Sequence, residues 1–326
     1  MAKILAVFGA TGQQGSSVVQ HVVQNPDLRA QYTIRALTRD INSASARSLQ
    51  NKDIEVLSAD VLDRASLDHA LRGVHTVFAM TPPYTSPSAP QGPSALAFEF
   101  ENGKRIADAA LAAGVKFFIF STLPSVREIS HGKYTSVAPF DGKAKAEAYI
   151  RGLAESGMKS AFICPGAFME NFAAQRWSAP RKGEDGVWVL ARPNGLGFRI
   201  PLIAAREDVG TFVGAVLRDG EKFKGRRVCA AEGRYTWEEV ARCLGRSVGR
   251  EVRFRQCSWE EWRGMAPFEG LKDFLEEVYR YPEEFGGYFG EGEEEGVRWA
   301  VESVGGKSEL TSLEKFLEKY TFELGD

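Results

Sequence analysis

Cysteine and surplus charge are both scarce in this sequence of 326 residues. Its four cysteines, Cys164, Cys229, Cys243 and Cys257, form no C-x-x-C pair, which excludes the common zinc and redox motifs and favours reduced thiols. Lysine and arginine total 41 against 43 aspartates and glutamates, a net charge of −2. A protein that binds nucleic acid directly needs surplus cations to displace condensed counterions. We therefore expect no direct contact with nucleic acid, and no metal site.

Long apolar runs are also missing. No stretch approaches the roughly 20 apolar residues that span a bilayer, so no membrane segment is expected. The apolar start at residues 3–8 is too short for a signal peptide and is interrupted by Gly9-Ala10-Thr11-Gly12. There is no internal repeat and no linker rich in serine, glycine or proline. With its reduced cysteines, the protein is expected in the cytoplasm or the nucleus.

The sequence does contain short apolar runs that alternate with amphipathic stretches. The runs are rich in β-branched and aromatic residues and too continuous to have one wet face, which predicts strands buried on both faces of a parallel sheet. Alternation of strands and helices predicts βαβ units, and hence an α/β fold with a Rossmann-type doubly wound sheet. The predicted strands are 3–8, 32–38, 54–58, 74–80, 115–120 and 159–164, and the predicted helices are 15–24, 43–50, 64–72, 95–113 and 140–156.

The composition shifts after about residue 165. Residues 180–200 are rich in glycine, proline and arginine, and a short αβ pattern returns at 207–257. We therefore expect a sheet domain over residues 1–165, to which later residues can add strands. Residues 166–326 are expected to form a smaller α/β domain that takes the substrate or the partner.

Three helix starts and one loop are predicted in the second domain. Asp208 is expected to cap one helix, and Thr236 opens a capping box at the start of the next. The Thr311-x-x-Glu314 spacing predicts a closing helix over 311–319. Residues 283–296 are acidic and glycine-rich, which predicts a solvated surface loop.

A glycine-rich segment, Gly9-Ala10-Thr11-Gly12-Gln13-Gln14-Gly15, links the first predicted strand to the first helix. One glycine lets the chain turn, a second lets backbone N–H groups approach a pyrophosphate, and a third lets the helix pack on the strand. The start of the helix adds free N–H groups and a partial positive charge. The segment therefore predicts a dinucleotide site whose phosphate-binding residues are Gly9, Thr11, Gly12, Gln13, Gln14 and Gly15.

The end of the second predicted strand bears on the choice of cofactor. Sites for NAD usually have an acidic residue here, which binds the ribose hydroxyls. In this sequence the strand ends Leu37-Thr38-Arg39, and Arg39 can pair with a 2′-phosphate through charge-assisted hydrogen bonds. Arg39 therefore favours NADP(H), although Asp40, the next residue, leaves NAD open.

Three further segments narrow the family. They are Phe140-Asp141-Gly142-Lys143, the run Cys164-Pro165-Gly166-Ala167-Phe168-Met169-Glu170-Asn171-Phe172, and Glu99-Phe100-Glu101-Asn102-Gly103-Lys104. With the glycine-rich loop and Thr38-Arg39, the sequence resembles the NmrA-like family of atypical short-chain dehydrogenases/reductases over roughly residues 1–250. That family includes fungal nitrogen-metabolite regulators, a mammalian NADPH sensor and many reductases.

The resemblance implies roles for residues beyond the glycine-rich loop. Arg39 matches the residue that binds the 2′-phosphate, and Lys143 matches the lysine near the nicotinamide. Glu170 and Asn171 belong either to the site or to the supporting structure. The other implied positions are Asp60 and Val61 at the adenine, Thr81 and Pro82 at the nicotinamide ribose, and Pro165, Ala167 and Phe168 over the nicotinamide face.

The sequence departs from active members of the superfamily at one position. Those enzymes carry a tyrosine four residues before the lysine, on the same helix face, where the lysine lowers its pKa. Here that position is Pro139, which has no ionisable group and is expected at the first helical position. Tyr134 and His131 lie in a predicted loop, and no regular spacing predicts whether either side chain lies near Lys143. Lys143 can bind the ribose or, as in the related isoflavone-reductase group, transfer a proton.

Two functions are consistent with this sequence. The favoured one is an NADP(H)-binding regulator or redox sensor that acts through a protein partner. The alternative is an NADPH-dependent oxidoreductase that reduces a small apolar carbonyl, imine or enone, with Lys143 as the catalytic proton donor. A proline-rich loop over 82–93 is a candidate lid. The aromatic residues Phe168, Phe172, Trp177 and Trp188 either line an apolar pocket or pack in the core, and packing is favoured for each.

Overall fold

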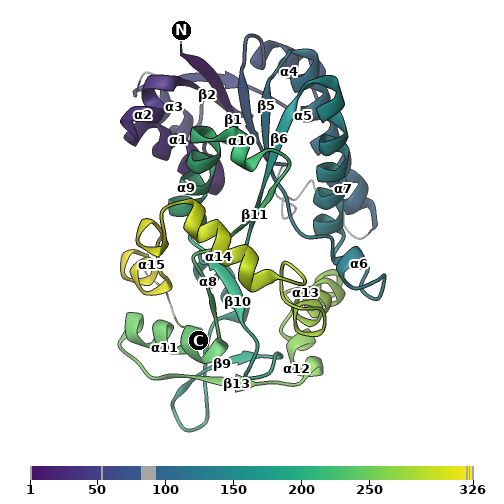
Figure 1. Ribbon diagram of the computed structural model, residues 1–326. Helices are drawn as coiled ribbons and strands as arrows, with labels where there is room; N and C mark the ends of the chain where they lie inside the picture. The colour runs from purple at the N-terminus through teal and green to yellow at the C-terminus, as the bar shows by residue number, and fades with distance from the viewer. Residues whose placement is uncertain (1, 53, 82–92, 321, 323, 325–326) are drawn as a thin grey trace. The chain divides into compact units, whose positions relative to one another are not determined.

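Figure 1 shows a computed structural model that describes residues 2–52, 54–81, 93–320, 322 and 324. The chain forms two compact units. The first unit is residues 1–125, 138–164 and 206–228, and the second is 126–137, 165–205 and 229–326. The expected boundary at residue 165 lies beside one of several crossings between the units. Within the described ranges, no helix combines the length and apolar character needed to cross a bilayer.

The first unit is built on a seven-stranded sheet with strand order β11-β6-β5-β4-β1-β2-β3, in which strands β1 to β6 pair in parallel. All six strands predicted from the sequence are present, which confirms the doubly wound α/β fold. β1 lies between β2 and β4, so the strand order reverses there, and such a switch point is where ligands bind in this class of sheet. The strands are β1 Lys3–Phe8, β2 Tyr32–Thr38, β3 Glu55–Ser58, β4 Thr76–Ala79, β5 Phe117–Ser121, β6 Lys159–Pro165 and β11 Arg227–Ala230.

Helices cover both faces of this sheet, with α1 to α3 on one side and α4, α5 and α7 on the other (Figure 1). The short helix α2 was not predicted, although Asn25 caps it and Pro26 opens it. Sheet and helices bury an apolar core that includes Val77, Phe118 and Phe162. The helices are α1 Gln13–Gln24, α2 Pro26–Gln31, α3 Ala44–Gln50, α4 Arg64–Ala70, α5 Pro93–Ala112, α7 Ala138–Gly152 with the 3-10 turn η1 Leu153–Ser156, α9 Ala205–Arg218 and α10 Gly220–Phe223.

The second unit contains two three-stranded sheets, β12-β10-β7 and β13-β9-β8. Its core is rich in aromatic residues, and Trp237 and Phe316 are almost completely buried in it. The strands are β7 Ala167–Phe168, β8 Arg181–Lys182, β9 Trp188–Arg192, β10 Ile200–Ile203, β12 Gly233–Tyr235 and β13 Val252–Gln256. The helices are α6 Val126–Ile129, α8 Asn171–Ala174, α11 Trp237–Val248, α12 Trp259–Gly264, α13 Lys272–Glu284, α14 Glu293–Ser303 and α15 Leu313–Lys319, with 3-10 turns η2 Arg176–Ser178, η3 Glu269–Leu271 and η4 Lys307–Glu309.

Two of the predicted helix caps are wrong. Helix α9 begins at Ala205, three residues before Asp208, because a Glu170 carboxylate oxygen accepts a hydrogen bond from the Ala205 N–H at 3.1 Å. Helix α15 begins after Ser312, whose hydroxyl caps it, rather than after Thr311. The capping box of Thr236 is confirmed. Pro139 is the second residue of α7, one position later than predicted.

The segment 283–296 is not the solvated loop that its composition predicts. It spans the end of α13, a turn with four glycines at positive φ, and the start of α14. Glu293 is buried, and its carboxylate accepts a hydrogen bond from the Arg234 Nε–H at 2.8 Å. The acidic residues therefore include structural hydrogen-bond acceptors, and the glycines make the turn.

Candidate functional site

The glycine-rich loop turns sharply between β1 and α1. Gly9 adopts a φ of +60°, which side chains disfavour, and the Gly12 N–H donates to the Gly9 carbonyl oxygen at 2.8 Å. Helix α1 then begins at Gln13 without a side-chain cap. Across the described residues, no group accepts a hydrogen bond from the backbone N–H groups of Gln13, Gln14 or Gly15. The loop therefore presents free donors at the positive end of a helix.

Gly12 and Gly15 differ in what a side chain would meet. A Cβ on Gly15 would lie 2.2 Å from the Gly9 carbonyl oxygen, so this glycine is required by the packing of α1 on the loop. A Cβ on Gly12 would approach that same oxygen at 3.3 Å and meet no other described atom within 4 Å. Gly12 is exposed, and its missing side chain leaves bare backbone where a pyrophosphate can approach. The loop thus fits a dinucleotide.

Gln14 has a structural role that the sequence did not indicate. Its side chain is buried, and its Oε1 accepts a hydrogen bond from the Ser121 hydroxyl at the end of β5, at 2.8 Å. The side-chain oxygen of Gln14 is therefore bound within the fold, and the backbone N–H of Gln14 remains available to a ligand. Thr11 and Gln13 are half-buried within the same turn.

Arg39 lies beside the loop at the end of β2. The Ala10 N–H donates to the Leu37 carbonyl oxygen at 3.2 Å, which joins the two segments. The Arg39 side chain is exposed, and nothing in the described part of the chain pairs with its guanidinium. By contrast, an Asp40 carboxylate oxygen accepts from the Asn42 N–H at 2.8 Å. At this strand end the Arg39 guanidinium is therefore unpaired among the described groups, while one oxygen of the exposed Asp40 carboxylate takes part in the local turn.

Asp60 and Val61 follow β3, the neighbouring strand. Asp60 is exposed and accepts from the Leu62 N–H at 2.9 Å, whereas Val61 packs partly against the core. Two exposed apolar residues that were not predicted from the sequence lie here, Ile41 after β2 and Leu62 after β3, which are 38% and 66% exposed. Leu62 directly follows the predicted site residue Val61, and Ile41 lies two residues after the predicted site residue Arg39, so their positions in the sequence were a usable signal.

Lys143 and Thr81, both predicted from the resemblance, are brought together. The Lys143 Nζ donates to the Thr81 hydroxyl and, at 2.5 Å, to the Glu99 Oε2. The Lys143 side chain is 16% exposed and that of Glu99 is 0% exposed. Burial lowers the pKa of Lys143 below the usual lysine value, and the charge of Glu99 opposes that shift. Pro82 and the candidate lid over 82–93 lie outside the described residues, except that residue 93 begins α5.

The close packing of α5 against α7 brings together two of the sequence motifs, residues 99–104 on α5 and residues 140–143 on α7. A Cβ on Gly142 would lie 2.7 Å from the Glu99 Cβ and the Leu96 carbonyl oxygen, and a Cβ on Gly103 would lie 2.7 Å from the Ala146 Cβ. The glycines therefore allow the close approach that brings Glu99 to Lys143. Glu99 was not predicted as a site residue, and the sequence signal of the close helix contact was Gly103, four residues later on the same helix.

The residues expected over the nicotinamide, Pro165, Ala167 and Phe168, belong to the second unit. Pro165 is also the last residue of β6, a strand of the seven-stranded sheet. Ala167 and Phe168 form β7, which pairs in parallel with Leu202 and Ile203 of β10. Their role toward a cofactor stays a prediction. Glu170, by capping α9, follows the structural alternative.

The aromatic residues of this region mostly pack. Phe172 and Trp188 lie against the core of the second unit, and the Trp177 ring lies 5.6 Å from that of Trp262. Packing is therefore confirmed for these three.

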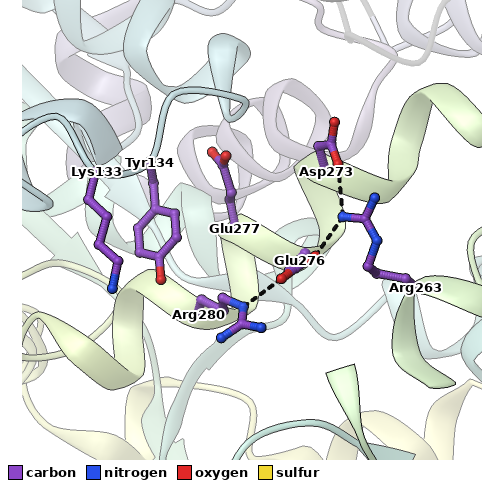
Figure 2. A pocket seen from close by; sticks show the side chains of 7 residues that line it. All are labelled: Lys133, Tyr134, Arg263, Asp273, Glu276, Glu277 and Arg280. Carbon is purple, nitrogen blue, oxygen red and sulfur yellow. Dashed lines mark hydrogen bonds and ion pairs between the residues drawn. The ribbon is translucent and has the colours of Figure 1, made fainter. Parts of the chain in front are cut away.

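Tyr134 lines a pocket of about 360 Å³ in the second unit (Figure 2). Its hydroxyl donates to a Glu284 carboxylate oxygen at 2.8 Å, and burial, followed by that carboxylate, raises the pKa of Tyr134. A raised pKa is the opposite of what a general acid near neutral pH requires. His131 is exposed, has a positive φ of 52° and contacts the Phe285 ring. The pocket is lined by Lys133, Tyr134, Arg263, Asp273, Glu276, Glu277 and Arg280.

Most of the charged side chains that line this pocket form ion pairs with one another. Arg263 donates to Asp273 at 2.8 Å and to Glu276 at 2.5 Å, and Arg280 donates to Glu276 at 2.7 Å (Figure 2). Glu277 accepts from the Ser136 hydroxyl at 2.9 Å. These contacts join α12, α13 and the chain before α7 within the second unit.

Comparison with known proteins agrees with the motifs. The model of the NmrA-like family matches residues 1–320. A relative from Cladobotryum sp, the NmrA-like family domain-containing oxidoreductase FrzB, is 31% identical, and the match covers 83% of this chain and 82% of that protein.

Solved structures share the fold. The negative transcriptional regulator NmrA in complex with NAD has a TM-score of 0.76 at 21% identity, over 98% of this chain and 95% of that one. The NADPH-dependent quinone oxidoreductase QOR2 of Escherichia coli, complexed with NADPH, has a TM-score of 0.71 at 22% identity, over 97% and 99%. The resemblance seen in the sequence is confirmed, and the chain belongs to the NmrA-like family.

Proposed function

We propose that the protein binds NADP(H) at the carboxyl edge of the seven-stranded sheet and reduces a small apolar carbonyl, imine or enone. The free N–H groups of Gln13, Gln14 and Gly15 would hold the pyrophosphate over the bare backbone of Gly12. Arg39 would bind the 2′-phosphate, because its guanidinium is exposed and unpaired among the described groups. The oxidoreductase name of FrzB and the cofactors in the two solved structures support the same class of ligand.

The observation that carries the reductase is the buried pair of Lys143 and Glu99. Desolvating a charge costs several kcal/mol for each ion, and buried groups with a shifted pKa are concentrated at functional sites. NADPH supplies a hydride when bound. Lys143 supplies the matching proton to the oxygen, nitrogen or carbon that becomes negative. This role needs no tyrosine at position 139.

A redox sensor is the second candidate, and Pro139 favours it. The position four residues before Lys143 holds no ionisable side chain, and one protein that shares this fold is a negative transcriptional regulator. In this case Lys143 would contact the bound cofactor, and the regulatory step would be binding to a protein partner in the cytoplasm or the nucleus.

A substrate panel separates the two candidates. Purified protein with NADPH is tested against quinones, aldehydes, enones and cyclic imines, with the loss of NADPH absorbance as the readout. The reductase predicts saturable NADPH oxidation with at least one class. A protein that binds NADPH, reduces no member of the panel and changes its protease sensitivity with the cofactor would support the sensor instead.

A further inference from the structure

Glu99 is a carboxylate held entirely inside the first unit. Its Oε2 accepts from the Lys143 Nζ at 2.5 Å, and within the described residues its Oε1 has no hydrogen-bond partner. Asn102, three residues later on the same face of α5, is also buried, and its Nδ2 has no partner there either. An incompletely satisfied buried carboxylate is destabilising, so its retention calls for a reason beyond stability.

Helix packing does not supply that reason. The close approach of α5 and α7 depends on Gly142 against Leu96 and Gly103 against Ala146, which are contacts between small groups and backbone. An apolar side chain at position 99 would fill the same space without desolvating a charge. What an apolar residue cannot do is hold the Lys143 ammonium.

We propose that Glu99 is the positioning residue of Lys143: its carboxylate fixes the ammonium beside Thr81 and keeps it charged. The inference rests on the proposed reductase function and adds a residue to it. In the proton step, an N–H bond of Lys143 breaks as an O–H, N–H or C–H bond forms on the substrate, whose negative charge comes from the hydride of NADPH. The neutral amine then takes a proton from solvent.

The other charged groups near Lys143 are engaged elsewhere. On α7, Asp141 accepts from the Ser125 hydroxyl at 3.3 Å, and Glu147 pairs with Arg151. On α5, Lys104 pairs with Asp108. The ends of β4 and β5 contribute uncharged hydroxyls, Thr81 to the Lys143 Nζ and Thr122 to its carbonyl oxygen. Glu99 is thus the charged group in direct contact with Lys143 among the described residues.

The charge of Glu99 therefore has a measurable effect on Lys143. Burial lowers the pKa of Lys143, and Glu99 raises it. Glu99→Gln keeps the size and one acceptor but removes the charge. An opposite charge at this range shifts a pKa by about 1–3 units, so the pKa of Lys143 should fall by about that amount.

Competitive acetylation of the cofactor-free protein tests this directly. Acetic anhydride labels neutral amines, and mass spectrometry of peptides gives the pKa of Lys143 from the labelling rate against pH. Glu99→Gln should raise the labelling rate at neutral pH by about 10- to 1000-fold. Glu101→Gln is the matched control, since Glu101 is exposed on the same helix and should leave the rate unchanged. An unchanged pKa in Glu99→Gln would overturn the proposal.

A second variant covers the case in which Glu99→Gln does not fold. Glu99→Asp keeps the charge but withdraws it by one methylene, so it should lower the pKa of Lys143 by less. No change in folded Glu99→Asp would also contradict the proposal. Because labelling needs neither substrate nor NADPH, a protein without reductase activity would refute the proposed function and leave this measurement intact.

Discussion

Gly15 lies so close to Gly9 that a Cβ on Gly15 would stand 2.2 Å from the Gly9 carbonyl oxygen, whereas Gly12 faces open space beyond a 3.3 Å contact. The same added methyl group should therefore have two different effects. Gly12→Ala should leave the fold intact and weaken NADPH binding about tenfold or more, the scale of one hydrogen bond to a charged group. Gly15→Ala should instead destabilise the fold by about 1–3 kcal/mol.

Isothermal titration calorimetry and thermal unfolding of both variants check this pair. Undiminished NADPH affinity in folded Gly12→Ala would remove the glycine-rich loop from the cofactor site.

Arg39→Ala should separate the two cofactors. A hydrogen bond to a charged group contributes about 1.5–3 kcal/mol, so NADPH affinity should fall roughly 10- to 150-fold while NADH affinity barely changes. Arg29→Ala, at an exposed arginine on α2, is the control for loss of surface charge. Equal losses for NADPH and NADH would show that Arg39 does not recognise the 2′-phosphate.

The buried pair should show strong coupling in stability. Lys143→Met alone leaves the Glu99 carboxylate buried without its cation, which costs about 3–5 kcal/mol. The double variant Lys143→Met/Glu99→Gln removes the charge as well, so it should recover most of that loss. Urea denaturation of the two single variants and the double variant measures the coupling, and additive losses would contradict a direct interaction.

The proton step predicts an alkaline limb in the pH profile of turnover. Lys143 donates only when protonated, so kcat should be full below its pKa and decline as pH rises through it. Burial lowers that pKa, and the decline should therefore begin below the free lysine value of about 10.4. A profile of kcat at saturating NADPH tests this. A decline centred at or above the free value would argue against a buried lysine acid.

Much of the fold could be predicted from the sequence because its signals are local. The apolar runs gave every strand of the sheet from β1 to β6, and the Gly9-to-Gly15 spacing placed the loop between β1 and α1. Contacts between distant residues were not predictable in this way. Glu99 meets Lys143 across 44 positions, and Glu170 caps α9 across 35.

The wrong prediction of a solvated loop over 283–296 also arises from a contact between residues that are distant in the sequence. The composition shows that a segment is acidic, but it does not predict which carboxylate forms an ion pair with a distant cation. Glu293 is buried and pairs with Arg234, 59 positions away, which compensates for the burial of its charge. The candidate site shows the same contrast between local signals and long-range contacts. Site residues next to predicted strand ends could be found from the sequence, whereas Glu99, which contacts Lys143, could not.

The role of Lys143 as the proton donor is tested most directly by kcat at saturating NADPH for the wild-type protein and Lys143→Met, with a substrate that the panel identifies. We expect kcat to fall roughly 10²–10⁴-fold in Lys143→Met, the usual contribution of a positioned acid, with at most a tenfold loss in NADPH affinity. Lys143→Arg should restore binding but not turnover, because a guanidinium does not release its proton near neutral pH. A Lys143→Met variant that retains the wild-type kcat would contradict the account.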